Sequence, residues 1–296
     1  MPFPAGSPER ALELARRLEA RGLYVPAVRP PTVPPGGSRL HIVCHAFNRA
    51  SELDELARAL EGMHTSVPPE PVRDAPGTAL FVVGTDTGVG KTVVSALLLR
   101  AARELGRAAY WKPVQTGTEN DSAAVLALSG AAAHECLPNA FHFPLPASPH
   151  EAAAAAGQTI EPRRISEGLR GLLRTLSGTR LVVELAGGLL VPYRSEPELV
   201  TQADWLSEAG AGLVLVARAG LGTLNHTLLT LEALRARHLE PRALFLVGAE
   251  HEANRRTLAR VAGVPRIFQL PSFEPLDADA LERWLAAHDL AELFTP

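Results

Sequence analysis

The sequence lacks the features that define several large classes of protein. Its 296 residues include two cysteines, Cys44 and Cys136, which lie far apart and in no metal-ligand spacing. This usage argues against a disulfide scaffold or a zinc site and favours buried thiols in a reducing compartment. No charged start followed by an apolar segment marks a secretory signal, and no apolar run approaches the ~20 residues of a membrane span. We therefore expect a cytoplasmic protein with no membrane partner.

An excess of positive charge is also absent. The chain has 29 basic and 32 acidic residues, which gives a formal net charge of -3. Proteins whose main partner is nucleic acid or anionic lipid present a concentrated basic surface, so we expect no nucleic-acid partner. What the chain does have is a hydrophobic content of 46%. That content suffices for a substantial core and for more than one structural unit.

Prolines mark a boundary within the chain. The stretch HTSVPPEPVRDAPG (64–77) holds four prolines and no apolar periodicity, which is typical of an extended linker. It separates a front segment, residues 1–63, from a larger segment, residues 78–296. In the front segment the patterns predict helices at 8–22 and 51–60, the second capped by Ser51, and strands at 23–28 and 39–44. The front segment is therefore predicted to be a small α+β unit.

The larger segment alternates between apolar strands and helices. The strand candidates, all strongly apolar, are residues 79–84, 108–114, 181–187, 213–219, 243–249 and 266–270. Helical patterns occupy residues 91–105, 122–129, 165–176, 224–238, 252–261 and 277–287. Continuously apolar strands that alternate with helices indicate a mostly parallel sheet covered on both faces. We predict a three-layer α/β domain of the P-loop NTPase kind.

The stretch GTDTGVGKT (84–92) is typical of a phosphate-binding loop between a strand and a helix. Gly88 and Gly90 let the backbone turn its N–H groups toward an anion. Lys91 can reach the outer phosphates, and Thr92 offers a hydroxyl to Mg²⁺ at a helix start whose dipole favours negative charge. The predicted ATP-binding residues are Thr85, Asp86, Thr87, Gly88, Val89, Gly90, Lys91 and Thr92. The alternative is a strand-turn-helix that contains Gly-Lys-Thr by coincidence.

Two departures from the usual patterns narrow the choice of family. The six-residue spacing of a phosphate loop puts Thr85, rather than Gly84, at the first glycine position. Partition and septum-site ATPases carry a second lysine early in this loop, where this chain has Asp86. A partition-type switch ATPase therefore stays a second hypothesis, and a non-catalytic nucleotide-binding module a third.

Six motifs in order carry a resemblance to one enzyme family. They are GTDTGVGKT (84–92), YWKPVQTG (110–117), ASPH (147–150), VELAGG (183–188), ADW (203–205) and GLGTLNHTLLT (220–230). With them, residues 77–296 resemble dethiobiotin synthetase, the ATP-dependent ligase of biotin synthesis. The resemblance implies that 7,8-diaminopelargonate, CO₂ and MgATP give dethiobiotin, ADP and phosphate through a phosphorylated carbamate.

The resemblance also implies roles for individual residues. Lys91, with Mg²⁺, would neutralise the outer phosphates, and Lys112 would hold the carbamate because it follows a strand at the carboxyl end of the sheet. Thr87 and Thr116 would lie near the substrate. The catalytic residues are therefore expected to be Lys112, Lys91 and Thr87. On composition alone, a solvated lysine at a strand end is the preferred interpretation of Lys112, and only the surrounding KPVQTG (112–117) reverses that preference.

Two carboxylates are expected to complete the Mg²⁺ site with Thr92. Glu184 ends an apolar strand, where a buried acid is costly unless a cation pairs with it. Asp121 opens a helical pattern and is the expected second carboxylate. The alternative for Asp121 is a helix N-cap, which is compatible with metal binding.

The segment GLGTLNH (220–226) opens another predicted helix. In the resembled family this helix start receives the distal carboxylate of the substrate across a dimer interface, an instance of anion binding at a helix N-terminus. The resemblance therefore implies a homodimer in which Gly222, Thr223 and Asn225 bind substrate. The alternative is a plain glycine-rich entry to a helix.

One position departs from the resembled family. Relatives end a late strand with an Asn-Asp pair whose asparagine reads the adenine edge, and this chain has Ala249 and Glu250 there. We therefore expect base contacts to come from elsewhere, such as the main chain after Phe268 or Pro271.

The front segment resembles part of a second biotin enzyme. The strings RALELARRLEARGLYV (10–25) and VRPPTVPPGGSRLHI (28–42) resemble the C-terminal end of 8-amino-7-oxononanoate synthase. The domain that bears the cofactor lysine of that enzyme is missing here, so we predict no synthase activity. The chain is then either a piece of a two-enzyme fusion or one whose start was assigned inside such a fusion.

Overall fold

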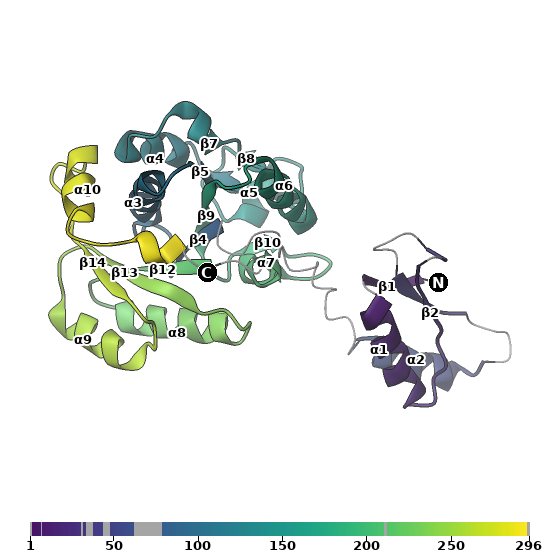
Figure 1. The fold of residues 1–296 in the computed structure, drawn as a ribbon. Helices are drawn as coiled ribbons and strands as arrows, with labels where there is room; N and C mark the ends of the chain where they lie inside the picture. The colour runs from purple at the N-terminus through teal and green to yellow at the C-terminus, as the bar shows by residue number, and fades with distance from the viewer. Residues whose placement is uncertain are drawn as a thin grey trace. The chain divides into compact units, whose positions relative to one another are not determined.

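The computed structural model describes residues 2–6, 8–30, 32–33, 38–43, 48–61, 79–209 and 212–294 (Figure 1). The chain divides into two compact units, Met1–Pro71 and Val72–Pro296. The predicted linker, residues 64–77, and Cys44 lie outside the described residues. Over the residues that the structure describes, no helix combines the length and the apolar character needed to cross a membrane.

The front unit packs two helices on a small antiparallel sheet. The helices are α1 (Pro8–Glu19) and α2 (Ala50–Glu61), and the strand order is β1 (Pro2–Gly6), β3 (Ser38–His41), β2 (Ala27–Val28). The α+β prediction is confirmed, although β1 was not predicted. Ser51 is not the cap of α2, because the helix begins one residue earlier; instead, the Glu52 carboxylate accepts the Arg49 backbone N–H at 2.9 Å.

The second unit is built on one parallel seven-stranded sheet. Its strand order is β14-β13-β12-β4-β9-β5-β7. The bounds are β4 (Ala79–Gly84), β5 (Ala108–Trp111), β7 (Cys136–Leu137), β9 (Arg180–Gly188), β12 (Gly212–Arg218), β13 (Pro241–Val247) and β14 (Ile267–Leu270). All neighbouring pairs in this sheet are parallel. The predicted three-layer P-loop architecture is confirmed.

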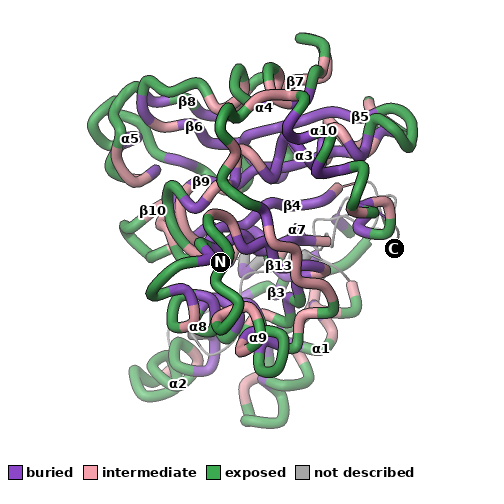
Figure 2. The backbone as a smooth tube through the Cα atoms, turned by 90° about the vertical axis from the view of Figure 1, so that its left-hand side faces the viewer, coloured by how far each residue is buried: buried purple, intermediate pink, exposed green. Residues whose placement is uncertain are grey.

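Helices cover both faces of this sheet, and the strands are buried between them (Figures 1 and 2). One face packs against α3 (Lys91–Glu104), α4 (Asp121–Ser129) and α10 (Ala278–Leu285). The other packs against α5 (Pro149–Ala155), α6 (Pro162–Thr175), α7 (Gln202–Ala209), α8 (Thr223–Arg235) and α9 (Glu252–Val261). Alternate residues of each strand face opposite layers, which explains why the strands are apolar throughout.

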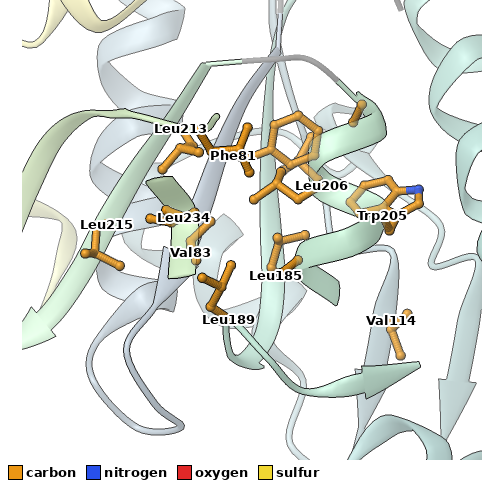
Figure 3. Close-up of a cluster of buried hydrophobic side chains, with 14 of the residues drawn as sticks. Phe81, Val83, Val114, Leu185, Leu189, Trp205, Leu206, Leu213, Leu215 and Leu234 are labelled. Carbon is orange, nitrogen blue, oxygen red and sulfur yellow. The ribbon is translucent and has the colours of Figure 1, made fainter. Parts of the chain in front are cut away.

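The larger core lies between the sheet and α7 (Figure 3). Phe81 of β4 and Trp205 of α7 meet edge to face, with ring centroids 5.6 Å apart. Leu185 and Leu206 are fully buried beside them. This packing fixes β4, whose carboxyl end carries the phosphate loop, and β9, which carries Glu184 in its middle.

The strand predicted at 108–114 is interrupted. It divides into β5 and β6 (Val114–Thr116), and β6 leaves the main sheet to pair with β8 (Phe141–Phe143). Pro113 lies at the break and has no backbone N–H to give to a ladder. Elements that the sequence patterns did not predict are α5, α7, β7, β8, β10 (Pro192–Arg194), β11 (Val200–Thr201) and two short 3₁₀ turns (Ala133–Glu135, Ala291–Phe294).

Candidate active site

The phosphate loop joins the end of β4 to the start of α3. Gly88 and Gly90 both have positive φ, +66° and +98°, which L side chains rarely adopt. At Gly90 a Cβ atom would also lie 2.7 Å from Cγ1 of Val247. The loop is therefore pressed against the end of β13, and only glycine fits at this position.

Lys91 folds back over the end of β4. Its Nζ donates a 2.8 Å hydrogen bond to the Asp86 carbonyl, and a Cβ at Gly84 would lie 2.9 Å from the same Nζ. Gly84 is thus required for close approach although it is one residue outside the usual spacing. Burial lowers the pKa of Lys91 to about 8, and the nearby charge of Glu184 opposes that shift only in part.

Three oxygen ligands converge where α3, α4 and β9 meet. The Thr92 hydroxyl oxygen lies 3.0 Å from Asp121 Oδ1 and 3.1 Å from Glu184 Oε1. The N-cap of α4 is Asn120, whose side chain accepts the Ala123 backbone N–H at 2.9 Å. Asp121 is therefore not the N-cap, and its carboxylate is directed toward Thr92.

Lys112 lies between the same two carboxylates. It is 6% exposed, and its Nζ donates to Asp121 Oδ2 and, at 3.1 Å, to Glu184 Oε1. The solvated-lysine alternative is therefore wrong. Burial alone would lower the pKa of Lys112, but the charges of Glu184 and Asp121 outweigh it and raise the pKa. The same pairing with Lys112 keeps the pKa of Asp121 low in spite of its burial.

Lys91 and Lys112 are the only lysines in the sequence, since all the other residues among the 29 basic ones are arginine. Both are buried, and both line one cleft. A chain that uses arginine everywhere else keeps lysine where a compact ammonium must approach several oxygens at once. This compositional signal was available in the sequence and was missed.

The cleft has a volume of about 910 Å³. It joins the phosphate loop to the loop between β6 and α4 and to the start of α5. Its lining includes the predicted residues Thr87, Gly88, Gly90, Lys91, Thr92, Lys112, Thr116, Asp121 and Glu184. The predicted metal and carbamate residues and five of the eight predicted ATP-binding residues are thus brought together, whereas Thr85, Asp86 and Val89 are not part of this lining.

The residues predicted at the start of α8 do not line this cleft. Gly222 is the N-cap of α8 with φ +89°, Thr223 is buried with its hydroxyl 3.3 Å from that of Thr227, and Asn225 is exposed within the first turn. Their role across a dimer interface stays a prediction.

The donor set fits a hard divalent cation. No group of three or more His, Cys, Asp or Glu side chains is arranged as a metal site anywhere in the described residues. One hydroxyl and two carboxylates are nevertheless the oxygen ligands that Mg²⁺ takes in nucleotide sites, where water and phosphate complete the octahedron. Thr92, Asp121 and Glu184 would hold such an ion.

Tyr110 is a site residue that the sequence analysis missed. It is fully buried in β5, and its hydroxyl donates a 3.0 Å hydrogen bond to Glu184 Oε2. Burial, together with the charge of Glu184, raises the pKa of Tyr110. Its only signal in the sequence is a polar hydroxyl inside the strand AAYW, which is too common a feature to point to a site.

Comparisons with known proteins converge on one family. A family model described as an AAA domain matches residues 78–280. The "ATP-dependent dethiobiotin synthetase BioD" of Nitrobacter hamburgensis is 42% identical over 71% of this chain and 93% of the relative. The protein of the same name from Rhodopseudomonas palustris (strain HaA2) is 43% identical over 68% and 89%. That from Rhizorhabdus wittichii is 41% identical over 74% and 99%.

Proposed function

The chain belongs to the family of ATP-dependent dethiobiotin synthetases, and we propose that it closes the ureido ring of dethiobiotin from 7,8-diaminopelargonate, CO₂ and ATP in biotin biosynthesis. One observation beyond the similarity supports this most. Both lysines of the chain line a single cleft beside the phosphate loop, together with Thr92 and the two carboxylates that pair with Lys112. That arrangement suits the joining of two anions, a carbamate and a triphosphate.

The proposed reaction has three steps. One amine of the substrate adds to CO₂ and loses a proton, which gives a carbamate. A carbamate oxygen then attacks the γ-phosphorus of ATP, and ADP leaves with the electrons of the broken P–O bond. The second amine attacks the carbonyl carbon of the resulting mixed anhydride and loses a proton. Phosphate departs with the oxygen that had joined it to carbon.

The phosphate loop and Lys91 bind the nucleotide in this proposal. The turn at Gly88 and Gly90 presents backbone N–H groups, and α3 begins at Lys91 with its positive dipole end facing the cleft. Lys91 Nζ is held above the end of β4 by the Asp86 carbonyl. It can exchange that neutral acceptor for phosphate oxygens, which are stronger acceptors for an ammonium group.

Lys112 provides the positive charge for the carbamate. Its ammonium is buried, is kept protonated by Asp121 and Glu184, and lines the cleft that also contains Thr87 and Thr116. A buried ammonium stabilises charge that develops on an oxygen more strongly than a solvated one does. Thr87 and Thr116 offer hydroxyl groups to the amines of the substrate.

A divalent cation, Mg²⁺ in this proposal, would be held by Thr92, Asp121 and Glu184. Bound there with the nucleotide, the ion supplies positive charge at the transferring phosphoryl group. The three side chains would provide oxygen ligands for the ion. Lys112 forms an ion pair with Glu184, one of the same carboxylates.

A homodimer completes the proposal. Gly222, Thr223 and Asn225 do not line the cleft, and in this proposal they contribute substrate contacts from a second copy of the chain. Leu221, Leu228 and Leu229 are exposed beside them and offer apolar area for such a contact. Light scattering on the purified protein tests this, and a monomer at assay concentrations would contradict it.

The front unit has no proposed catalytic role. The family match begins at residue 78, so the resemblance of residues 5–60 to the C-terminal end of 8-amino-7-oxononanoate synthase remains a proposal based on its sequence strings. We expect the purified chain to form no 8-amino-7-oxononanoate when supplied with pyridoxal phosphate and the substrates of that synthase. Formation of that product would contradict the expectation.

The proposed function is tested by measuring dethiobiotin and ADP together. We expect both in equal amounts when ATP, diaminopelargonate and bicarbonate are all present, and neither when the diamine is left out. ADP release that does not depend on the diamine or on bicarbonate would instead indicate a switch ATPase. Nucleotide binding with no turnover under any condition would indicate a non-catalytic module.

A further inference from the structure

The two oxygens of Glu184 have different surroundings. Oε1 lies 3.1 Å from the hydroxyl of Thr92 and 3.1 Å from Nζ of Lys112, at the side of the cleft. Oε2 accepts the 3.0 Å hydrogen bond from the phenol of Tyr110, and this bond is buried. Glu184 itself is 1% exposed. Oε1 is thus directed toward the proposed metal ligands, and Oε2 is held by a hydrogen bond from a core residue.

The geometry of the sheet explains how Tyr110 reaches this carboxylate. Tyr110 of β5 pairs in register with Val182 of β9, and Glu184 lies two residues further along β9 on the same face. A tyrosine side chain is long enough to span that diagonal. Its ring belongs to the core between the sheet and α3, where it is 0% exposed. The phenol therefore has little freedom to point elsewhere.

The neutral character of this donor matters. An arginine or lysine in place of Tyr110 would add a second positive charge beside Glu184, which already pairs with Lys112, whereas a phenol orients the carboxylate and adds no charge. Hydrogen bonds of this kind to a ligating carboxylate orient it and tune its affinity for metal. A tyrosine with only a structural role would not need a proposed metal ligand as its hydrogen-bond acceptor, because a backbone carbonyl or a water molecule would satisfy the same hydroxyl.

We propose that Tyr110 is a positioning residue, which fixes Glu184 through Oε2 so that Oε1 is presented to a divalent cation. This inference rests on the proposed function, because it takes Thr92, Asp121 and Glu184 as the ligands of that cation. It goes further in assigning the affinity of the site for the cation partly to a residue that does not touch the ion.

The substitution Tyr110→Phe tests the inference by removing one hydroxyl group. We expect the affinity of the protein–ADP complex for Mg²⁺, measured by calorimetry, to fall about 10-fold or more. The Mg²⁺ concentration for half-maximal dethiobiotin formation should rise in parallel, while kcat at saturating Mg²⁺ changes little. A merely structural loss would lower kcat or the amount of folded protein and leave the dependence on Mg²⁺ unchanged, which would overturn the inference.

Tyr193→Phe is the matched control. Tyr193 is also buried, and its hydroxyl donates to Gln202 Oε1 at 3.1 Å instead of to a proposed metal ligand. The same hydroxyl is lost in both variants, so we expect Tyr193→Phe to leave the Mg²⁺ affinity within about twofold of the original. An equal loss of affinity in the two variants would assign the effect to packing and would overturn the role of Tyr110.

Glu184→Gln separates failure of the inference from failure of the proposed function. If Glu184→Gln weakens Mg²⁺ binding and Tyr110→Phe does not, the result supports the proposed metal site and contradicts the positioning role of Tyr110. If neither substitution changes Mg²⁺ binding, the ion is not held at Glu184, and the proposed metal site falls as well.

A second measurement needs no variant at residue 110, in case Tyr110→Phe does not fold. The chain has three tyrosines, so biosynthetic labelling with 3-fluorotyrosine gives three ¹⁹F signals, which Tyr193→Phe and Tyr24→Phe assign by elimination. We expect the Tyr110 signal of the ADP complex to shift on addition of Mg²⁺ while the Tyr193 signal stays in place. A Tyr110 signal that Mg²⁺ does not move would overturn the inference.

Discussion

The two units of the chain differ in what they bury. Among the described residues of the front unit, the buried side chains are apolar apart from Ser38. The phosphate-loop unit buries Lys91, Lys112 and Glu184 close together. Burying a charge costs free energy unless other groups pair with it, and a pair of apolar residues would often be more stable. The second unit therefore keeps charges that folding alone does not require, and those charges mark its chemistry.

The largest expected effect comes from removing one of these buried charges. Lys112→Ala should lower the rate of dethiobiotin formation about 100- to 1000-fold, the range for loss of one preorganised donor to a developing charge. The affinity for ADP, measured by calorimetry, should change much less, because Lys112 contacts Asp121 and Glu184 and not the phosphate loop.

Arg103→Ala is the control for that substitution. Arg103 forms its ion pair with Glu135 at 3.1 Å and does not line the cleft, so we expect turnover to stay within about twofold of the original. Full turnover in Lys112→Ala would contradict the role of its buried charge in the cleft. An equal loss of turnover in Arg103→Ala would show that removing a paired charge outside the cleft has the same effect.

The next largest effect should come from the backbone of the phosphate loop. Gly90→Ala forces a side chain into φ +98° and against Val247, which costs about 1–3 kcal/mol in backbone strain before the collision is counted. We expect unfolding in denaturant at a clearly lower midpoint, and ATP affinity at least about tenfold weaker. Gly88→Ala, at φ +66° with no atom within 4 Å of the added Cβ, should lower the midpoint less. Equal midpoints in the two variants would be inconsistent with the close approach at Gly90.

A smaller effect is expected from pH. Burial holds the pKa of Lys91 near 8 instead of 10.5, and bound phosphates favour the charged form and raise that pKa. Below pH 8 both free and bound protein carry the proton, so the affinity for ADP should be constant. Above pH 8 the free protein loses the proton first, so affinity should fall by at most about tenfold per pH unit.

The same lowered pKa predicts the pH dependence of stability. The unfolded chain keeps the Lys91 proton up to its ordinary pKa, so unfolded molecules bind more protons than folded ones above pH 8. The Lys91 contribution to the free energy of unfolding should therefore rise with pH in that window. Lysine-selective ¹³C labelling gives two side-chain signals for this chain, and titration of the Lys91 signal near pH 10.5 would contradict both expectations.

The smallest effect on catalysis is expected from the front unit. Leu14 is 2% exposed in its apolar core, and Leu14→Ala should destabilise that unit by about 2–5 kcal/mol. We expect dethiobiotin formation by the purified variant to stay unchanged, because the described residues that line the cleft all belong to the phosphate-loop unit. Loss of turnover in proportion to unfolding of the front unit would show that the two units do not function separately.

Much of the phosphate-loop unit could be predicted because its local signals agree. The apolar strand at 79–84, the glycines at 88 and 90, and the helix from Lys91 are found where the sequence patterns predicted them. In a parallel sheet the carboxyl ends of neighbouring strands meet at one edge. The convergence of Lys112, which follows the end of β5, with the loop therefore follows once the strands are placed, whereas Glu184 lies in the middle of β9.

The rest depends on contacts that no local pattern contains. The choice between Asn120 and Asp121 as the N-cap is a matter of one residue, and either is an acceptable cap. The break at Pro113 moves β6 out of the sheet to pair with β8, a partner some 27 positions away in the register Val114–Phe141. The role of Tyr110 depends on a diagonal contact between two strands that are distant in sequence.

In the proposed reaction the γ-phosphoryl group of ATP is transferred to a carbon dioxide adduct of the substrate, and water does not receive it. Turnover of ATP and diaminopelargonate with freshly added ¹⁸O-labelled carbon dioxide, in unlabelled water and for a time shorter than oxygen exchange, tests this directly by mass spectrometry of the released phosphate. We expect one ¹⁸O atom in each phosphate formed with dethiobiotin, since the carbamate oxygen that attacks phosphorus leaves with it. Phosphate without ¹⁸O would show that water, and not a carbamate, receives the phosphoryl group.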